Sequence, residues 1–137
     1  MIRINYDHQI FSEQKYGGIS RYFIELYKHL HNESVFNINI DSFSSNNAYL
    51  NKVDKSIVSF TFTNKIFLRL NYKLNQFYSK YKLQKRDYDL FHPTYYDPYF
   101  LDYIDDKPFV LTVHDMIHER YFDNDIVTQN KRILCEK

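Results

Sequence analysis

The sequence predicts an α/β fold in which a mostly parallel sheet is flanked by helices. Three observations support this prediction: short segments of alternating polarity, an amphipathic helical segment between the first two of them, and the placement of the chain's two glycines, Gly17 and Gly18. The glycines lie between the first predicted strand and the helix. A strand, a glycine turn and a helix form the first half of a βαβ unit, and such units build parallel sheets.

Hydrophobic spacing defines the first two strands and the helix between them. Residues 2–6 alternate apolar and polar side chains up to Asp7, as a half-buried strand does. Residues 8–16 are expected to form a loop. Apolar residues then recur three and four positions apart over residues 19–30, which predicts a helix with one stripe packed on the sheet. Residues 35–40 alternate again and predict the second strand.

The middle of the chain predicts a polar loop, a third strand and a long basic helix. Ser and Asn dominate residues 42–47, and residues 57–62 are suited to a strand. Over residues 65–86 the apolar side chains fall on one helical face and Lys and Arg on another, which indicates a basic amphipathic helix. Residues 55–86 carry eight Lys or Arg and no acidic residue, so the near-neutral total charge conceals a basic patch.

Two further strands are predicted in the last third. Residues 88–91 form a short apolar segment that ends at a proline, which cannot extend a ladder. A loop rich in Tyr and Asp is expected over residues 95–106. Residues 109–113 are a continuous β-branched and aromatic run, typical of a strand buried on both faces of a parallel sheet. A last helix is expected from Asp125 to Lys137.

Candidate ligand-binding residues follow three of these predicted elements. Gly17 and Gly18 open a helix, and a helix N-terminus presents unpaired N–H groups that attract an anion, most often a phosphate. His92 ends one predicted strand, and His114 with Asp115 ends another. Doubly wound sheets bind ligands outside the carboxyl ends of their strands, so these residues are expected to line one crevice.

Composition excludes several classes of protein. A chain of 137 residues that is 44% hydrophobic is long enough for one globular domain, and a net charge of +1 argues against a nucleic-acid binder. The apolar segments are too short to span a membrane, and the N-terminus lacks the apolar core of a signal peptide. A single cysteine, Cys135, suits a reducing compartment, so a cytoplasmic protein is expected.

Four segments of the chain also resemble a known family when they are taken together and in order. They are His8-Gln9-Ile10-Phe11, Tyr16-Gly17-Gly18-Ile19-Ser20-Arg21-Tyr22, Tyr88-Asp89-Leu90-Phe91-His92-Pro93 and Leu111-Thr112-Val113-His114-Asp115-Met116-Ile117-His118. The chain resembles the N-terminal domain of retaining glycosyltransferases of family 4, also called group 1, in the GT-B superfamily. The resemblance implies a Rossmann-like acceptor-side domain facing a second domain that binds a nucleotide-sugar donor.

The resemblance also implies roles for the candidate residues. Gly17 and Gly18 would approach the donor diphosphate from across the cleft, and Arg21, one turn into the helix, could reach a phosphate. His114 would lie beside the reacting sugar, next to Asp115. It could orient a hydroxyl or stabilise developing charge without acting as the base. No cofactor other than the donor substrate, and no metal, is expected.

The acceptor is expected to contact His92, Tyr95 and Tyr96, because aromatic faces mixed with carboxylates are what sugar sites use. Each of these sites has a structural alternative: the glycines could form a turn without a ligand, a histidine could simply tie down its loop, and the tyrosine loop could be packed. His114 and His118 have the spacing of a zinc-binding helix. The glutamate of such a helix is misplaced here and no third ligand is evident, which argues against zinc.

The chain departs from the family in its length. Members usually run to more than twice 137 residues and carry a C-terminal donor-binding domain, so residues 1–137 are expected to be one partial domain with a sheet incomplete at its C-terminus. The resemblance then implies a fragment of an enzyme of surface polysaccharide or lipopolysaccharide assembly, acting on a glycan or lipid-linked acceptor. Such a fragment is expected to be inactive alone and to pair with a second copy or a separate C-terminal half.

A different class of function stays open. The chain could be a stand-alone α/β binding or interaction module whose working surface is the basic helix of residues 65–86. That helix could be only a solvated face, or it could contact an anionic membrane. No motif supports nucleic-acid binding.

Overall fold

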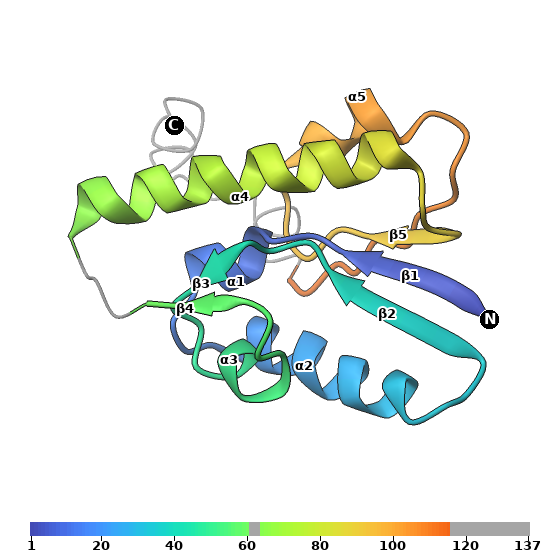
Figure 1. The fold of residues 1–137 in the computed structure, drawn as a ribbon, viewed down its shortest axis with the longest axis horizontal. Helices are drawn as coiled ribbons and strands as arrows, with labels where there is room; N and C mark the ends of the chain where they lie inside the picture. Colours follow the sequence, from blue (N-terminus) through green and yellow to red (C-terminus); the bar gives the residue numbers. More distant parts are fainter. Residues whose placement is uncertain (61–63, 116–137) are drawn as a thin grey trace, which may run out of the picture.

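The computed structural model describes residues 1–60 and 64–115. Its main sheet has three parallel strands, β1 (Ile2–Tyr6), β2 (Phe36–Ile40) and β5 (Leu90–His92), in the order β2-β1-β5 (Figure 1). In the register of this sheet, Ile4 of β1 lies opposite Ile38 of β2 and Leu90 of β5. The expected α/β fold with a mostly parallel sheet flanked by helices is confirmed.

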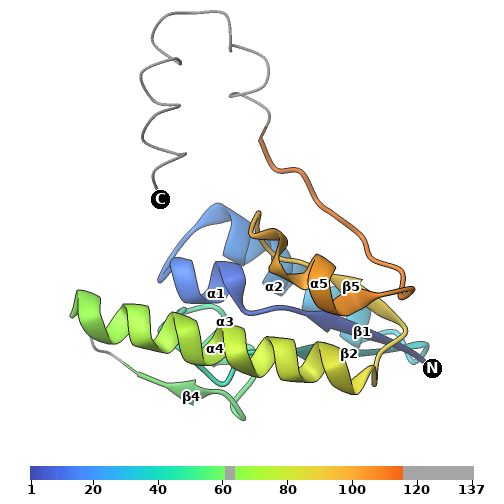
Figure 2. The same ribbon diagram turned by 90° about the horizontal axis from the view of Figure 1, so that it is seen from above.

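The other elements connect and cover these strands. They are α1 (Gln9–Glu13), α2 (Gly18–His31), β3 (Ser44–Ser45), α3 (Leu50–Val53), β4 (Val58–Ser59), α4 (Lys65–Lys85), the 3-10 helix η1 (Pro98–Phe100) and α5 (Leu101–Ile104). Figure 1 shows α2 along one side of the sheet and α4 along the other, and Figure 2 shows α1 and α5 beside α4.

The main core lies between the sheet and α2. The alternation of β1 and β2 places Tyr6, Ile38 and Ile40 on one face, where Phe23 and Ile24 of α2 are buried with them. The hydrophobic stripe predicted for residues 19–30 therefore packs as expected, and the β1 and α2 predictions are confirmed. This packing holds the N-terminus of α2 at the carboxyl end of β1.

Two predicted loops are ordered, buried structure instead. Residues 8–16 contain α1, because Ile10 and Phe11 are fully buried and draw this segment into the core. Residues 42–47 contain β3, and the side chains of Ser45 and Asn47 are also fully buried. The Ser45 Oγ donates to the Phe11 carbonyl oxygen at 2.7 Å, so tertiary contacts stabilise a segment whose composition suggests a surface loop.

The third predicted strand forms only in part among the described residues. Of residues 57–62, Val58 and Ser59 form β4, which pairs with β3 in a separate two-stranded sheet, and the structure does not describe residues 61–63. Both residues of β4 are exposed. The main sheet gains no strand from this segment because the polypeptide turns away from β2 after Asp41.

Helix α4 has the predicted bounds but not the packing expected of an amphipathic helix. The Asn64 Oδ1 accepts from the Ile66 N–H at 2.9 Å and caps its start, and Arg86 ends it in a left-handed conformation with φ 55°. The helix buries Asn71, Asn75, Ser79 and Leu83, while its apolar stripe is exposed. The inward face of α4 is therefore mostly polar.

The predicted strand of residues 109–113 only touches the sheet. Phe109 joins β5 through an isolated parallel bridge to Phe91, with the Val110 N–H donating to the Phe91 carbonyl oxygen at 2.9 Å. Phe109, Val110, Leu111 and Val113 are 44–54% exposed, so burial on both faces is wrong for this segment. The helix predicted over residues 125–137 lies outside the described residues.

The segment predicted as a tyrosine-rich loop, residues 95–106, contains η1 and α5. The Asp97 Oδ1 accepts from the Tyr99 N–H at 3.0 Å and starts η1, with Pro98 in its first turn. Behind this segment lies a second, mostly aromatic core. Its buried members are Leu83, Tyr88, Phe91, Tyr99, Phe100 and Ile104.

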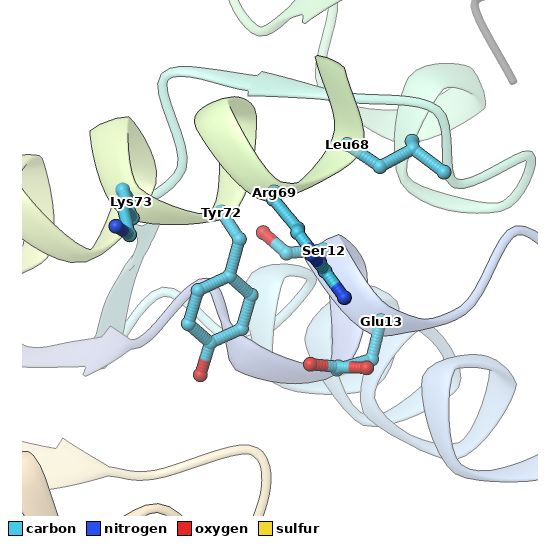
Figure 3. Close-up of a pocket in the computed structure, with 6 residues that line it drawn as sticks. All are labelled: Ser12, Glu13, Leu68, Arg69, Tyr72 and Lys73. Atoms are coloured by element: carbon cyan, nitrogen blue, oxygen red, sulfur yellow. The ribbon is translucent and has the colours of Figure 1, made fainter. Parts of the chain in front are cut away.

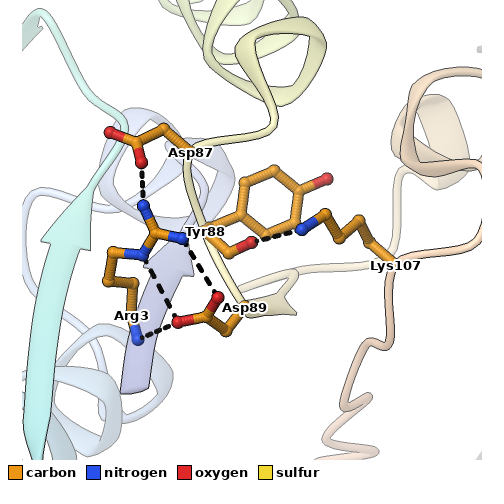
Figure 4. Close-up of polar contacts among 5 residues, drawn as sticks. All are labelled: Arg3, Asp87, Tyr88, Asp89 and Lys107. Carbon is orange, nitrogen blue, oxygen red and sulfur yellow. Dashed lines mark hydrogen bonds and ion pairs between the residues drawn. The ribbon is translucent and has the colours of Figure 1, made fainter. Parts of the chain in front are cut away.

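Polar contacts at the start of the sheet join β1 to β5 (Figure 4). The Arg3 guanidinium forms ion pairs with Asp87 and with Asp89, the latter at 3.1 Å, and the Arg3 N–H donates to Asp89 at 2.9 Å. The Lys107 Nζ donates to the Tyr88 carbonyl oxygen at 2.9 Å. The Arg3 contacts hold the Asp89 pKa at about 2, well below its usual value.

Among the described helices, none combines the length and apolar character that crossing a bilayer requires.

Candidate functional site

The candidate site begins at the N-terminus of α2. Gly17 is the N-cap residue with φ −178° and ψ 159°, an extended conformation, and Gly18 is the first helical residue. Neither glycine has a positive φ, so a left-handed turn is not the reason for them. The first N–H groups of an α-helix have no partner within the helix, and no side chain of the described residues caps this one.

The two glycines differ in the room that each would leave for a side chain. A Cβ added to Gly17 would lie 2.0 Å from the Gln14 Oε1, the far end of a flexible side chain that can move. A Cβ added to Gly18 would have no other atom within 4 Å, and Gly18 is exposed. The helix N-terminus is therefore open to a bound molecule at Gly18.

His114 lies against the first turns of this helix. The centroid of its ring lies 5.2 Å from that of Tyr22 and 5.6 Å from that of Phe23, both in edge-on contacts. The backbone N–H of His114 donates to the Tyr96 hydroxyl at 3.3 Å. The His114 Nε2 is buried without a hydrogen-bond partner among the described residues. Desolvation lowers the pKa of His114, so its imidazole is neutral near pH 7.

His92, at the end of β5, packs on the same Phe23 ring as His114. Its ring contacts Phe23 at 5.0 Å and Tyr6 at 5.3 Å, and its Nε2 lies 2.8 Å from the Thr112 Oγ1. Burial, and after it the charge of His114, lowers the pKa of His92 to about 4. His92 is therefore buried, neutral and already hydrogen-bonded. It is less accessible to an acceptor than the sequence analysis predicts.

The remaining candidate residues surround this pair of histidines. Tyr95 and Tyr96 have their ring centroids 4.8 Å apart; Tyr95 packs on the core and Tyr96 is 47% exposed. Arg21 and Asp115 are both exposed. The structure therefore brings the N-terminus of α2, His92, His114 and Tyr96 to one region at the carboxyl end of the sheet.

A buried carboxylate that the sequence analysis did not select supports this region. Asp7, directly after β1, accepts hydrogen bonds at 2.9 Å from the Thr94 N–H and at 2.6 Å from the Thr94 Oγ1. It also accepts from the Gln9 Nε2 at 2.7 Å and from the Tyr99 hydroxyl at 3.3 Å. Burial raises the pKa of Asp7, and the bonds from Thr94 and Gln9 oppose that rise. The Asp7 network fixes the backbone immediately before Tyr95.

The sequence holds one signal for this network, an aspartate placed where a core strand ends. His8, the next residue, is fully buried beside Tyr72, with ring centroids 5.0 Å apart. Burial lowers the pKa of His8 to about 3. Its Nδ1 lies 3.0 Å from the nearby Ser12 Oγ, but the Tyr72 and Tyr99 rings that pack on it are distant in the sequence, so periodicity could not have identified its burial.

A separate pocket of about 420 Å³ lies between α1 and α4 (Figure 3). Figure 3 shows Ser12 and Glu13 on α1 facing Arg69 and Tyr72 on α4. Leu68 and Lys73 complete the lining. Four of its lining residues belong to the basic helix predicted over residues 65–86, but none of the predicted catalytic, phosphate-binding or acceptor-binding residues lines it.

Among the residues that the structure describes, no group of three or more His, Cys, Asp or Glu side chains is placed to bind a metal ion. His118, the second histidine of the zinc alternative, lies outside the described residues.

The chain matches no known protein-family model, no curated protein and no solved structure. The geometry at the carboxyl end of the sheet is therefore the basis of the functional argument.

Proposed function

We propose that this chain is the acceptor-side domain of a retaining family 4 glycosyltransferase of the GT-B superfamily. Together with a donor-binding domain it would transfer a sugar from a nucleotide-sugar donor to a glycan or lipid-linked acceptor, in the cytoplasm, during surface polysaccharide or lipopolysaccharide assembly. The observation that carries the proposal is the convergence of the open N-terminus of α2, the unpartnered His114 Nε2 and the Tyr96 ring.

The N-terminus of α2 supplies the chemistry for a diphosphate. Its unpaired N–H groups and the helix dipole favour a negative charge, and the open space at Gly18 lets phosphate oxygens approach the backbone. Arg21, exposed in the first turn, adds a positive charge beside them. This surface forms one wall of the site, and the donor-binding domain would supply the other.

His114 supplies a neutral hydrogen-bonding atom beside that wall. Because its pKa is lowered, the His114 imidazole is uncharged near neutral pH. Its unpartnered Nε2 would bond to a sugar hydroxyl once the ring turns this atom out of its buried position. Its role would be to orient the reacting sugar, with the departing phosphate available to take the acceptor proton. Asp115 and the exposed Tyr96 lie next to it and would contact the sugars.

Nitrogen-15 NMR tests the diphosphate site directly. The chain has two glycines, so the glycine region of an amide spectrum holds signals from Gly17 and Gly18 alone. Both signals should shift on titration with nucleoside diphosphate sugars and remain in place with nucleosides. We expect Arg21→Ala to weaken this binding by about fivefold and Arg69→Ala, an equal charge loss on α4, to leave it unchanged. Glycine signals that ignore every phosphate compound would contradict the proposal.

The role of His114 is tested by transfer activity in the presence of the donor-binding domain. His114→Ala should lower kcat by about 100-fold, the usual contribution of a positioned imidazole. The matched control is His29→Ala, an exposed histidine of α2 away from its N-terminus, which should keep wild-type turnover. Equal rates for His114→Ala and wild type would remove His114 from the site.

One observation favours the second candidate function, an α/β interaction module. The exposed apolar stripe of α4 is unusual for a surface that has no partner. A chain that binds through α4 but never binds a nucleotide sugar would belong to this class.

A further inference from the structure

The inward face of α4 is polar, and its side chains are engaged. The Asn75 Oδ1 accepts from the N–H groups of Phe43 and Ser44 at 2.9 and 3.1 Å, and its Nδ2 donates to the Ser44 carbonyl oxygen at 2.7 Å. One turn away, Asn71 bonds to the Ser44 Oγ, and the Ser79 Oγ lies 2.7 Å from the Tyr99 hydroxyl. These contacts determine which side of α4 faces the protein.

The outward face of α4 is therefore apolar. It presents a continuous row of large apolar side chains at helical spacing, which we call the α4 stripe. Its members are Ile66 (78% exposed), Phe67 (39%), Leu70 (54%), Leu74 (50%), Phe77 (74%) and Tyr81 (46%). An exposed contiguous apolar patch of this kind marks an interaction site.

Basic side chains border the α4 stripe. At 3.6 residues per turn, Arg69 and Lys73 lie along one edge of the stripe, and both are exposed. At the C-terminal end the Lys85 Nζ lies 4.7 Å from the centre of the Tyr81 ring. Lys80 instead lies over the Tyr103 ring at 5.2 Å, toward α5. α4 carries no acidic residue, and Glu13 of α1 faces Arg69 across the neighbouring pocket.

We propose that the α4 stripe docks on an anionic lipid bilayer, with α4 lying in the plane of the membrane surface. An apolar face bordered by Lys and Arg is the pattern of interfacial helices, in which the apolar side chains enter the acyl boundary and the cations meet anionic headgroups. α4 has 21 residues and runs along the outside of the molecule, so it can present its full length to a flat surface (Figure 1, Figure 2).

Charge argues for a lipid surface over a second copy of the chain. Two α4 helices packed stripe to stripe would bring Arg69 and Lys73 of both copies together without an acidic residue of α4 between them. An anionic bilayer attracts the same side chains. The proposal does not rest on the glycosyltransferase function, because it uses none of the residues at the carboxyl end of the sheet.

Vesicle flotation of the full chain tests the proposal. The chain should float with vesicles of phosphatidylcholine mixed with phosphatidylglycerol and much less with phosphatidylcholine alone. The preference should weaken in high salt, since the Debye length falls from about 10 Å at 0.1 M to about 3 Å at 1 M. Equal binding to both vesicle types, or none to either, would overturn the proposal.

Matched variants assign the binding to α4. Replacing Arg69 and Lys73 by Gln should weaken binding by about 25-fold, at about fivefold for each cation near the surface. Replacing Lys52 and Lys55, exposed cations outside α4, by Gln should have no such effect. Leu70→Ser should reduce binding, whereas Val35→Ser, at the same 54% exposure on another part of the molecule, should not. Equal losses in the α4 and control variants would contradict the assignment.

Fluorescence reports whether the stripe enters the bilayer. The chain contains no Trp, so the F77W variant carries a single emitter on the α4 stripe, and V35W carries one elsewhere. Emission of F77W should shift to the blue with anionic vesicles, and that of V35W should not. An unshifted F77W, or a chain that forms dimers broken by Leu70→Ser and binds no vesicles, would show that the stripe has another occupant. His114→Ala should bind vesicles like wild type, which separates this test from that of the proposed function.

Discussion

Two buried aspartates follow neighbouring strands and differ in how well they are hydrogen-bonded. Asp7 accepts from donors on Thr94, Gln9 and Tyr99, and the bonds from Thr94 and Gln9 oppose the rise in pKa that burial causes. Asp41, at the end of β2, accepts from the Asn5 Nδ2 at 3.1 Å. Burial therefore raises the pKa of Asp41 to about 7, although the nearby charge of Lys82 opposes the rise.

This pKa predicts how stability changes with pH at Asp41. The folded state holds the Asp41 proton up to about pH 7, whereas the unfolded state loses it near the ordinary value of 3.8. The contribution of Asp41 to folding is thus intact below the unfolded pKa and is lost as pH rises through about 7. Asp41→Asn should be more stable than wild type at pH 8, by on the order of 3 kcal/mol.

Urea unfolding of both proteins at several pH values measures this difference. The advantage of Asp41→Asn should shrink steadily below pH 7 and vanish below the unfolded pKa of 3.8, where wild-type Asp41 is protonated in both states. Taking the difference between the two proteins removes the opposite slope of His8 and His92, which are neutral when folded. A constant difference across the pH range would show that Asp41 is charged in the fold.

At the scale of elements, α4 shows the limit of reasoning from hydrophobic periodicity. The spacing of its apolar residues correctly predicts a helix over residues 65–86, and the structure has one at Lys65–Lys85. Apolar stripes usually face the core. Here Asn71 and Asn75 face inward, because backbone groups of β3 need partners there and the amide side chains supply them.

Adjacent positions of α4 provide a sharp test of this orientation. Asn75→Ala should destabilise the protein by about 2–3 kcal/mol, because it leaves buried groups of Phe43 and Ser44 without partners. Leu74→Ala should cost less than about 0.5 kcal/mol, since Leu74 is 50% exposed. Denaturant midpoints measure both. The reverse order of effects would mean that the apolar stripe of α4 faces the core.

At the scale of the whole molecule, the sheet is covered unevenly. α2 covers one face of β1 and β2, and the second, mostly aromatic core covers β5 at Phe91. Residues 109–113 instead expose their apolar side chains beside β5 and join it by the single bridge at Phe109. Exposed apolar edges of this kind promote association between molecules.

Self-association of the chain should therefore depend on this edge. Leu111→Lys places a charge on an exposed apolar residue, and it should lower the apparent mass at high protein concentration without lowering stability. Light scattering across a concentration series measures the mass, and thermal unfolding provides the stability control. The comparison variant Lys107→Leu makes the reverse exchange of Lys and Leu at a position before the apolar segment of residues 109–113. An unchanged association in Leu111→Lys would place the contact elsewhere.

The candidate site was predictable in part. The residues that end strands and open α2, namely Gly18, His92 and His114, could be selected because parallel strands bring their carboxyl ends to one edge. The spacing could not show that His92 is buried with a partner at Thr112. Nor could it show that Asp7 is held by Thr94, which lies more than 80 residues away in the sequence.

The sequence by itself determined the elements with strong local periodicity: the strand of residues 2–6, the helix after Gly18 and the long basic helix. Their spacing is a property of neighbouring residues, and it holds before any tertiary contact forms. The tertiary structure alone decided which faces are covered. Periodicity separates an apolar face from a polar one, but the free energy of satisfying buried backbone groups turned the Asn75 side of α4 inward and left the Phe77 side exposed.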